Sequence, residues 1–171
     1  DIKFDSFDNY QEFISKGAEG GQDLWWVKQA DATNFTMGIK GNGGPVGFEA
    51  NPTPELNKWY NYTITYNGGY EYNSFKFYFD GNTLDYGSSQ YNAESNFQMN
   101  CTNEPLFFGY EYNNTWSLHG SLDNITIWAD ELANDDINKI INNQIDEIDA
   151  ELTGYWKFNA GDSTILYDHS G

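Results

Sequence analysis

Three acidic residues recur at every second position near the C-terminal end, in the stretch Glu147-Ile148-Asp149-Ala150-Glu151. On a β-strand, alternate residues share one face, so the three carboxylates would lie together. Two carboxylates on either side of a glycosidic bond are the groups that hydrolyse it. If this stretch is a strand beside a cleft, it predicts a polysaccharide hydrolase that uses Glu147 and Glu151.

The residues just before this stretch favour a helix instead. Isoleucines recur at helical spacing from these residues into the stretch itself, at Ile137, Ile140, Ile141, Ile145 and Ile148. Asn134 is the expected N-cap, and we predict one amphipathic helix over 134–148 laid on the sheets. Residues two apart on a helix are rotated by about 200°, so the three carboxylates would diverge. The alternative is a strand that starts after Asp146 and turns the acids outward. We therefore predict that the stretch is not catalytic.

The overall charge narrows the choice of partners. The 171 residues include 26 acidic and 8 basic side chains, which gives a net charge of −18. This charge argues against nucleic acid and anionic membrane surfaces as partners, but it is compatible with calcium and neutral sugars. The only cysteine, Cys101, cannot form an internal disulfide, and no apolar run is long enough for membrane insertion.

Alternation with a period of two dominates the chain and predicts strands. Tyr62, Ile64 and Tyr66 share one face of a strand, and Phe75 and Phe77 share another before an Asp-Gly hairpin turn. Further strands are expected at 24–29, 33–40, 46–49, 106–110 and 123–128. Many short strands separated by Gly and Asn turns predict an all-β, two-sheet antiparallel jelly-roll sandwich.

Successive motifs resemble the laminin-G-like, concanavalin A-like jelly-roll family. "KWYNYTITYNG" is similar to a Trp-led strand of the family, and "FKFYFDGN" to a strand that ends in Tyr-x-Asp-Gly. "PLFFGYEYNNTWSLHGSLDNITIW" and "ADELANDDINKI" resemble its last strands and closing helix, and "EFISKG" resembles an early strand. The resemblance implies two antiparallel sheets and a recognition function. In glycanase relatives it places catalytic acids on a central concave strand, whereas Glu147 to Glu151 follow the closing helix.

The C-terminal stretch "LTGYWKFNAGDSTILYDHSG" resembles the opening segment of the family. The usual opening strand is missing before Asp1. We therefore expect a single domain over 1–171, in which 153–171 completes the sandwich by filling a vacant sheet position. In the alternative, this segment is donated to a neighbouring copy of the chain.

Asp123 is the leading candidate for a calcium ligand, and Asp168 is a weaker second. Asp123 has the same parity as Ile125 and Ile127, so its carboxylate would need a partner on an apolar face. Calcium, which takes six to eight oxygen ligands, is one such partner. The resemblance also implies a structural calcium at this strand start. The alternative is that Asp123 caps a turn.

A loop at the sandwich rim supplies the predicted ligand-binding residues. Tyr110, Tyr112, Asn113 and Trp116 combine aromatic faces with an amide, which suits stacking on a glycan. The alternative is that Trp116 only covers the sheet edge. Five Asn-x-Ser/Thr sequons, at Asn34, Asn61, Asn100, Asn113 and Asn124, are possible N-glycosylation sites.

Together these features predict a secreted or cell-surface module for recognition and adhesion, without catalysis. We expect calcium-assisted binding of a glycan or another surface polymer. One alternative is a structural subunit of an extracellular fibre or surface layer. The other is a glycan hydrolase that uses Glu147 and Glu151.

Overall fold

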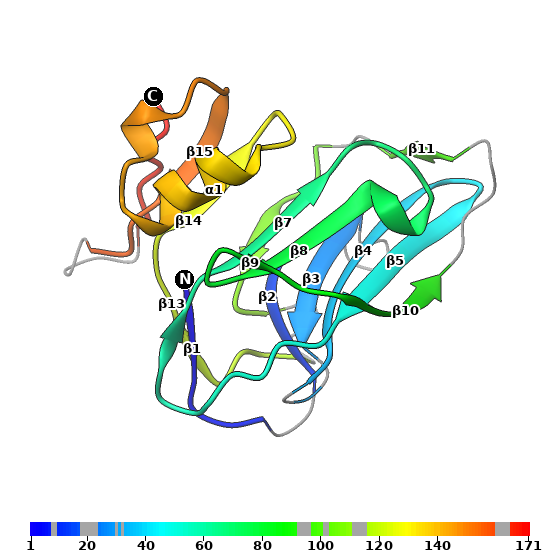
Figure 1. Cartoon of the computed structure of the whole chain (residues 1–171), viewed down its shortest axis with the longest axis horizontal. Coiled ribbons are helices and arrows are strands. Elements are labelled where there is room, and N and C mark those ends of the chain that lie inside the picture. The colour runs from blue at the N-terminus through cyan, green and yellow to red at the C-terminus, as the bar shows by residue number, and fades with distance from the viewer. Residues whose placement is uncertain are drawn as a thin grey trace.

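A computed structural model describes most of the chain. It covers residues 1–7, 10–17, 24–29, 31, 33–91, 97–100, 103–110, 116–159 and 165–171, with the backbone alone at 72 and 86–91. The described residues form mostly antiparallel strands in several sheets, with one short α-helix (Figure 1). The predicted all-β sandwich is confirmed.

The larger layer is one seven-stranded sheet in the order β10-β5-β4-β3-β2-β12, with β11 paired to β4. Every pairing in it is antiparallel, as expected for short strands joined by tight turns. Its strands are β2 (Gln11–Lys16), β3 (Trp25–Gln29), β4 (Phe35–Asn42), β5 (Gly44–Ala50), β10 (Tyr86–Tyr91), β11 (Gln98–Met99) and β12 (Leu106–Phe108).

The opposite layer consists of three smaller sheets. The first has the order β13-β1-β6, the second β7-β8-β9, and the third pairs β14 with β15. Their strands are β1 (Ile2–Phe4), β6 (Trp59–Tyr60), β7 (Tyr62–Tyr66), β8 (Phe75–Phe79), β9 (Asn82–Thr83), β13 (Gly120–Leu122), β14 (Ile125–Trp128) and β15 (Leu152–Trp156). A 3₁₀ turn, η1 (Tyr72–Ser74), precedes β8. Thus β6 runs into β7, and β13 runs into β14, but the partners change along the way.

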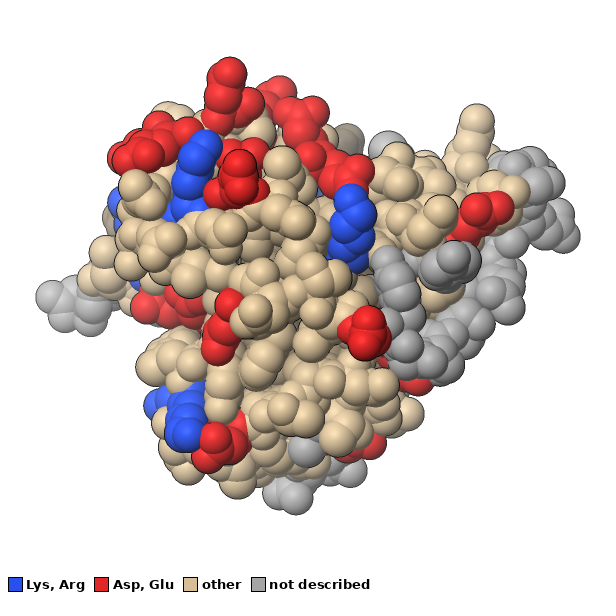
Figure 2. Space-filling view, viewed as in Figure 1, with Lys and Arg blue, Asp and Glu red and all other residues tan. Residues whose placement is uncertain are grey.

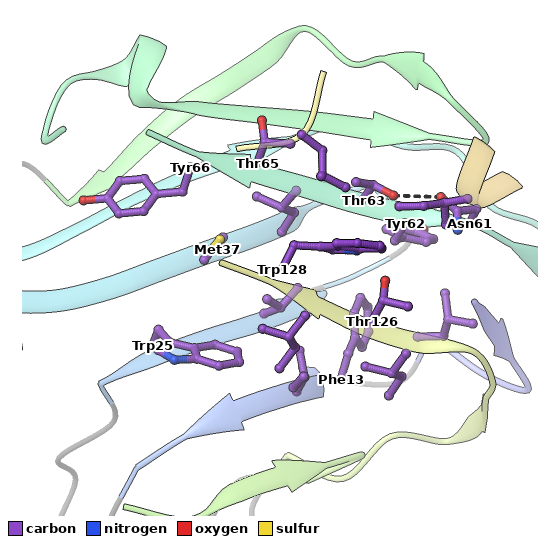
Figure 3. Close-up of a pocket in the computed structure, with 18 of the residues that line it drawn as sticks. Phe13, Trp25, Met37, Asn61, Tyr62, Thr63, Thr65, Tyr66, Thr126 and Trp128 are labelled. Atoms are coloured by element: carbon purple, nitrogen blue, oxygen red, sulfur yellow. Dashed lines mark hydrogen bonds between the residues drawn. The ribbon is translucent and has the colours of Figure 1, made fainter. Parts of the chain in front are cut away.

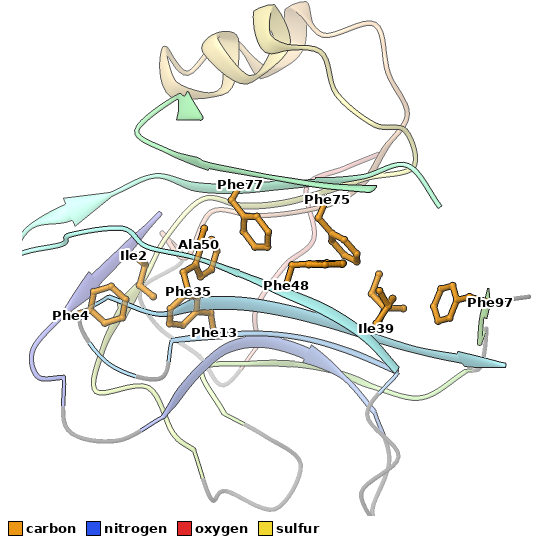
Figure 4. Packing of buried hydrophobic residues seen from close by; sticks show 11 residues of the cluster. Ile2, Phe4, Phe13, Phe35, Ile39, Phe48, Ala50, Phe75, Phe77 and Phe97 are labelled. Carbon is orange, nitrogen blue, oxygen red and sulfur yellow. The ribbon is translucent and has the colours of Figure 1, made fainter. Parts of the chain in front are cut away.

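The core lies between the two layers and is rich in phenylalanine (Figure 4). Phe35 from β4 is fully buried, and its ring centroid lies 4.5 Å from that of Tyr62 and 5.5 Å from that of Phe77. Edge-on contacts of this kind add to the hydrophobic contribution of the buried rings. The predicted alternation at Phe75 and Phe77 is confirmed.

Alternation turns Tyr78 to the opposite face of β8 from Phe77, yet this side chain is buried as well. Tyr78 has almost no exposed surface, because the α-helix covers the outer face of β8. Its hydroxyl donates a hydrogen bond of 3.0 Å to Asn134 Oδ1. With Leu132, Ile137 and Ile148, Tyr78 forms a second, smaller apolar cluster.

The helix α1 (Asn134–Ile141) is shorter than predicted. The polar run after it ends the helix, since Asn143 has a φ of 56° and the Asn142 side chain donates to the Asn138 carbonyl. A separate 3₁₀ turn, η2 (Ile145–Glu147), then buries Ile145. The N-cap residue is Ala133 rather than Asn134.

Beyond α1, the C-terminal strand β15 pairs with β14 of the same chain. The Trp156 ring also contacts Phe108 of the larger sheet, with 4.9 Å between ring centroids. The segment at 153–159 therefore has a partner within its own chain. That the sandwich depends on this partner stays a prediction about stability.

Candidate functional site

The face of the seven-stranded sheet that points away from the core combines buried side chains, such as Trp26, with more exposed ones. Alternation places Phe35, Met37 and Ile39 of β4 inward, so Thr36 and Gly38 face outward. Trp26 stands opposite Gly38 in the ladder, and its indole covers that position so closely that any Cβ there would collide with it. The glycine thus lets a large ring lie against the sheet.

A group of two aromatic rings and a lysine lies beside Trp26. The Lys28 ammonium is 4.4 Å from the ring centroid of Trp116 and 4.9 Å from that of Tyr10. The two ring centroids are 5.4 Å apart. Tyr10 is 47% exposed, while Trp116 and Lys28 are half-buried. Cation–π attraction at such sites contributes roughly 0.5–1 kcal/mol, which holds the Tyr10–Lys28–Trp116 cluster together.

The backbone of β2 positions Trp116. The Trp116 carbonyl accepts a 2.8 Å hydrogen bond from the Glu12 N–H. Glu12, only 1% exposed, stands opposite Lys28, and the same row continues through Thr36 to Glu49 on β5. The two acids in this row are three strand spacings apart, or about 14 Å.

The predicted rim residues are only partly brought together. Trp116 lies beside Glu12, whereas Tyr110 lies beside Ser15, whose hydroxyl donates to the Tyr110 carbonyl over 3.5 Å. Tyr110 is exposed, and its ring packs 5.3 Å from that of Phe107. Tyr112 and Asn113 fall outside the described residues. Sequence reasoning missed Tyr10 and Lys28, although the strand parity shared by Lys28 and Trp26 was a usable signal.

The surroundings of Asp123 offer two carboxylates to an ion. Asp123 Oδ1 accepts the Asn124 N–H at 2.8 Å, which is the geometry of the turn-capping alternative. The Asp1 carboxylate accepts hydrogen bonds from the side chains of Asn61 and Asn124. No group of three or more His, Cys, Asp or Glu side chains in the described part of the chain is placed to share a metal. Calcium at Asp123 stays a prediction.

Asp168 fastens the C-terminal residues to β15. Its carboxylate accepts the N–H groups of Tyr155 and Ser170, each at 2.9 Å, and these bonds lower the pKa of the carboxyl. The His169 N–H in turn donates to the Tyr155 carbonyl. These bonds give Asp168 a structural role that needs no metal.

The described sequons differ in how free their amides are. The side-chain amides of Asn61 and Asn124 both donate to Asp1, and that of Asn34 donates to Asp31. Asn100 is half-buried, and Asn113 lies outside the described residues. A glycan on Asn61 or Asn124 would therefore displace hydrogen bonds at the start of β1.

The acidic stretch that could have hydrolysed a glycan is exposed. Glu147 ends the turn η2, and its carboxylate accepts a hydrogen bond from Gln144. Asp149 and Glu151 are also exposed and precede β15, and the Glu151 carbonyl accepts the Ala129 N–H. The pocket lined by β4, β7 and β14 takes no residue from this stretch (Figure 3).

Two facing antiparallel layers form a lectin-like β-sandwich, and the Tyr10–Lys28–Trp116 cluster lies on the outer face of the larger layer. Residues 2–138 match the family described as the concanavalin A-like lectin/glucanases superfamily, and the chain belongs to it. A search of the curated proteins found no match to the chain. Among the described residues, no helix has the length and apolar character needed to cross a membrane.

Proposed function

We propose that this domain is a non-catalytic recognition module that binds a neutral polysaccharide through the Tyr10–Lys28–Trp116 cluster. The observation that carries the proposal is the packing of two aromatic rings, one of them 47% exposed, around a lysine on an outer sheet face. Aromatic faces cover the C–H surface of a sugar ring in sites of this kind.

The charge of the protein supports a neutral ligand. Acidic side chains gather over the end formed by α1 and β15, and few lysines interrupt them on that face (Figure 2). With a net charge of −18, the domain repels polyanions over long distances. The opposition of Glu12 and Lys28 across the ladder also leaves little net positive charge at the cluster.

The placement of the acids supports binding without hydrolysis. Glycoside hydrolysis needs two carboxyl groups about 5–10 Å apart across the sugar. Glu12 and Glu49 lie farther apart than this on the outer face, and Glu147 and Glu151 point to solvent away from it. A secreted or cell-surface location, with a role in adhesion, belongs to the same proposal and draws on the sequons.

The test is a binding screen against soluble neutral polysaccharides by affinity electrophoresis, followed by titration calorimetry on the best ligand. Trp116→Ala and Tyr10→Ala should each weaken binding about tenfold or more, because stacked rings are typical hot spots. Trp59→Ala is the matched control, since Trp59 is 49% exposed with the Lys3 ammonium 5.7 Å from its ring, but lies on the other layer.

Thermal melting of each variant separates loss of binding from loss of folding. Equal weakening by Trp59→Ala would show nonspecific adsorption, and release of reducing sugar would show catalysis. Either result overturns the proposal.

A further inference from the structure

The outer edge of the strand β15 is covered by residues 168–170, the edge cover. β14 pairs with the other edge of β15. On the outer edge, the Tyr155 N–H donates to the Asp168 carboxylate at 2.9 Å, and the Tyr155 C=O accepts the His169 N–H at 2.7 Å. The N–H and C=O groups of an antiparallel strand residue point to the same edge, so Tyr155 is a point at which another strand could pair.

The edge cover has no regular secondary structure and is held by a few hydrogen bonds. Its bond to the Tyr155 N–H comes from a side chain, and the bond from the Ser170 hydroxyl to the Thr153 C=O measures 3.3 Å. Asp168 is exposed, and so is Tyr167 just before it. Hydrogen bonds in contact with water exchange readily with bonds to water, so the cover can leave the edge without unfolding β15.

The edge beneath the cover is complementary to the same edge of a second copy. In an antiparallel pair centred on Tyr155, the two copies of this residue exchange both of their backbone hydrogen bonds. Thr153 of each copy then stands opposite Lys157 of the other. Lys157 is the only charged residue from Thr153 to Phe158, so this register places no like charges opposite one another.

We propose that the outer edge of β15 is a pairing site for the same strand of a second copy of this chain, and that residues 168–170 hold the site closed. Pairing joins the β14–β15 sheets of the two copies across this edge. The interaction is separate from polysaccharide binding, which uses the outer face of the opposite layer.

The charge of the protein makes this association depend on salt. Each copy carries a net charge of −18, and acidic side chains gather at the end formed by α1 and β15 (Figure 2). Two such ends repel one another over a distance of about 10 Å at 0.1 M salt, and over less in stronger salt. The unchanged chain should therefore be monomeric in dilute solution, and added salt should favour pairing.

The test compares Asp168→Ala with the control Asp149→Ala in the full chain by sedimentation velocity, over a range of protein and salt concentrations. Asp149 is exposed and precedes β15, so its loss removes the same charge but none of the bonds made by Asp168. Asp168→Ala should form dimers at a protein concentration about tenfold or more below that needed by the unchanged chain, because two bonds of the cover are lost. Asp149→Ala should behave like the unchanged chain.

A second variant opens the edge by a different change. His169→Pro removes the N–H that bonds the Tyr155 C=O and should promote dimers in the same way. Thermal melting establishes that each variant is folded. In the dimers, hydrogen exchange should slow at the Tyr155 and Lys157 amides as the protein concentration rises, while the amides of β3 keep their rates.

Three results would overturn the proposal. One is that folded Asp168→Ala and His169→Pro both stay monomeric at millimolar concentration in high salt. Another is equal association of Asp149→Ala, which would assign the effect to the lost charge. The last is a dimer in which the Tyr155 amide gains no protection, which would place the contact on another surface.

Discussion

The two layers of the sandwich expose different chemistry. The seven-stranded sheet is an unbroken ladder in which side chains such as Trp26 and Lys28 form the outer face. The opposite layer is divided into three sheets, and the strand partners change at Asn61 and Asn124. Asn124 has a φ of 47°, which turns the chain between β13 and β14. A continuous sheet thus presents a row of side chains on its outer face, while the interrupted layer turns its chain at each change of partner.

Among the changes that test this difference between the layers, removal of residues 152–171 should reduce the stability of the protein most. The deletion removes β15, which pairs with β14, and takes the Trp156 ring away from Phe108 of the larger sheet. We expect aggregation or loss of cooperative unfolding, measured by size-exclusion chromatography and thermal melting. The shorter deletion of 165–171 retains β15 and should remain folded. A monomeric 1–151 chain with an unchanged melting transition would contradict the prediction.

Phe35→Ala, in the continuous layer, should cause the second largest loss in the free energy of unfolding. Phe35 is fully buried and contacts the rings of Phe13, Tyr62 and Phe77 from both layers. We expect a loss of about 3–5 kcal/mol in the free energy of unfolding, measured by urea denaturation. Ile137→Val in the smaller cluster is the comparison and should cost about 1 kcal/mol. A Phe35→Ala cost no greater than that of Ile137→Val would show that the shared core is not the main source of stability.

In a 171-residue chain prepared with a free amine at Asp1, the interrupted layer should make stability depend on pH. The ammonium pKa is about 6 in the folded protein and 8.0 when unperturbed, so the unfolded chain binds more protons between these values. The free energy of unfolding should therefore rise with pH from 6 to 8, by up to about 2 kcal/mol. Acetylation of the amine should flatten this slope while leaving both histidines in place. An identical slope after acetylation would assign the effect to other groups.

These sequence patterns identified most of the local structure correctly. Alternation located β7 and β8, because a half-buried strand needs apolar residues at every second position. The predicted end of the helix was wrong. The isoleucine spacing continues to Ile148, but α1 ends at Ile141 because Asn143 adopts a left-handed backbone conformation. The contact of Lys28 with Trp116 depends on tertiary packing, which no local pattern specifies. The change of strand partners at Asn124 also depends on the whole fold.

Tyr78→Phe should weaken the docking of α1 on β8 by about 1 kcal/mol, which is a typical net value for one hydrogen bond. The variant removes only the hydroxyl that donates to Asn134 Oδ1. Urea denaturation measures the change, and Asn134→Ala in the Tyr78→Phe background should add little. A full additional loss would show that the two side chains stabilise the protein independently.

Addition of calcium should change the stability of the folded protein least. At a concentration equal to its Kd, an ion that binds only the folded protein stabilises it by about 0.4 kcal/mol. We predict a small rise in Tm that a chelator reverses and that Asp123→Asn abolishes. Asp168→Asn should leave the increment unchanged, since both oxygen-acceptor bonds of that carboxylate fasten the chain to itself. An unchanged Tm with calcium in excess would remove the ion from the proposed mechanism.

The pairing of Asp1 with Asp123 also constrains how fast the domain can fold. These residues are 122 positions apart, yet their mutual hydrogen bonds seat β1 at the centre of its layer. Contacts between such distant residues carry a large loop-closure cost before they stabilise anything. The seven-stranded sheet needs only residues up to Phe108, so it can form first on a growing chain. Refolding should be slow, in the millisecond-to-second range typical of all-β proteins, with closure of the smaller layer as its last step.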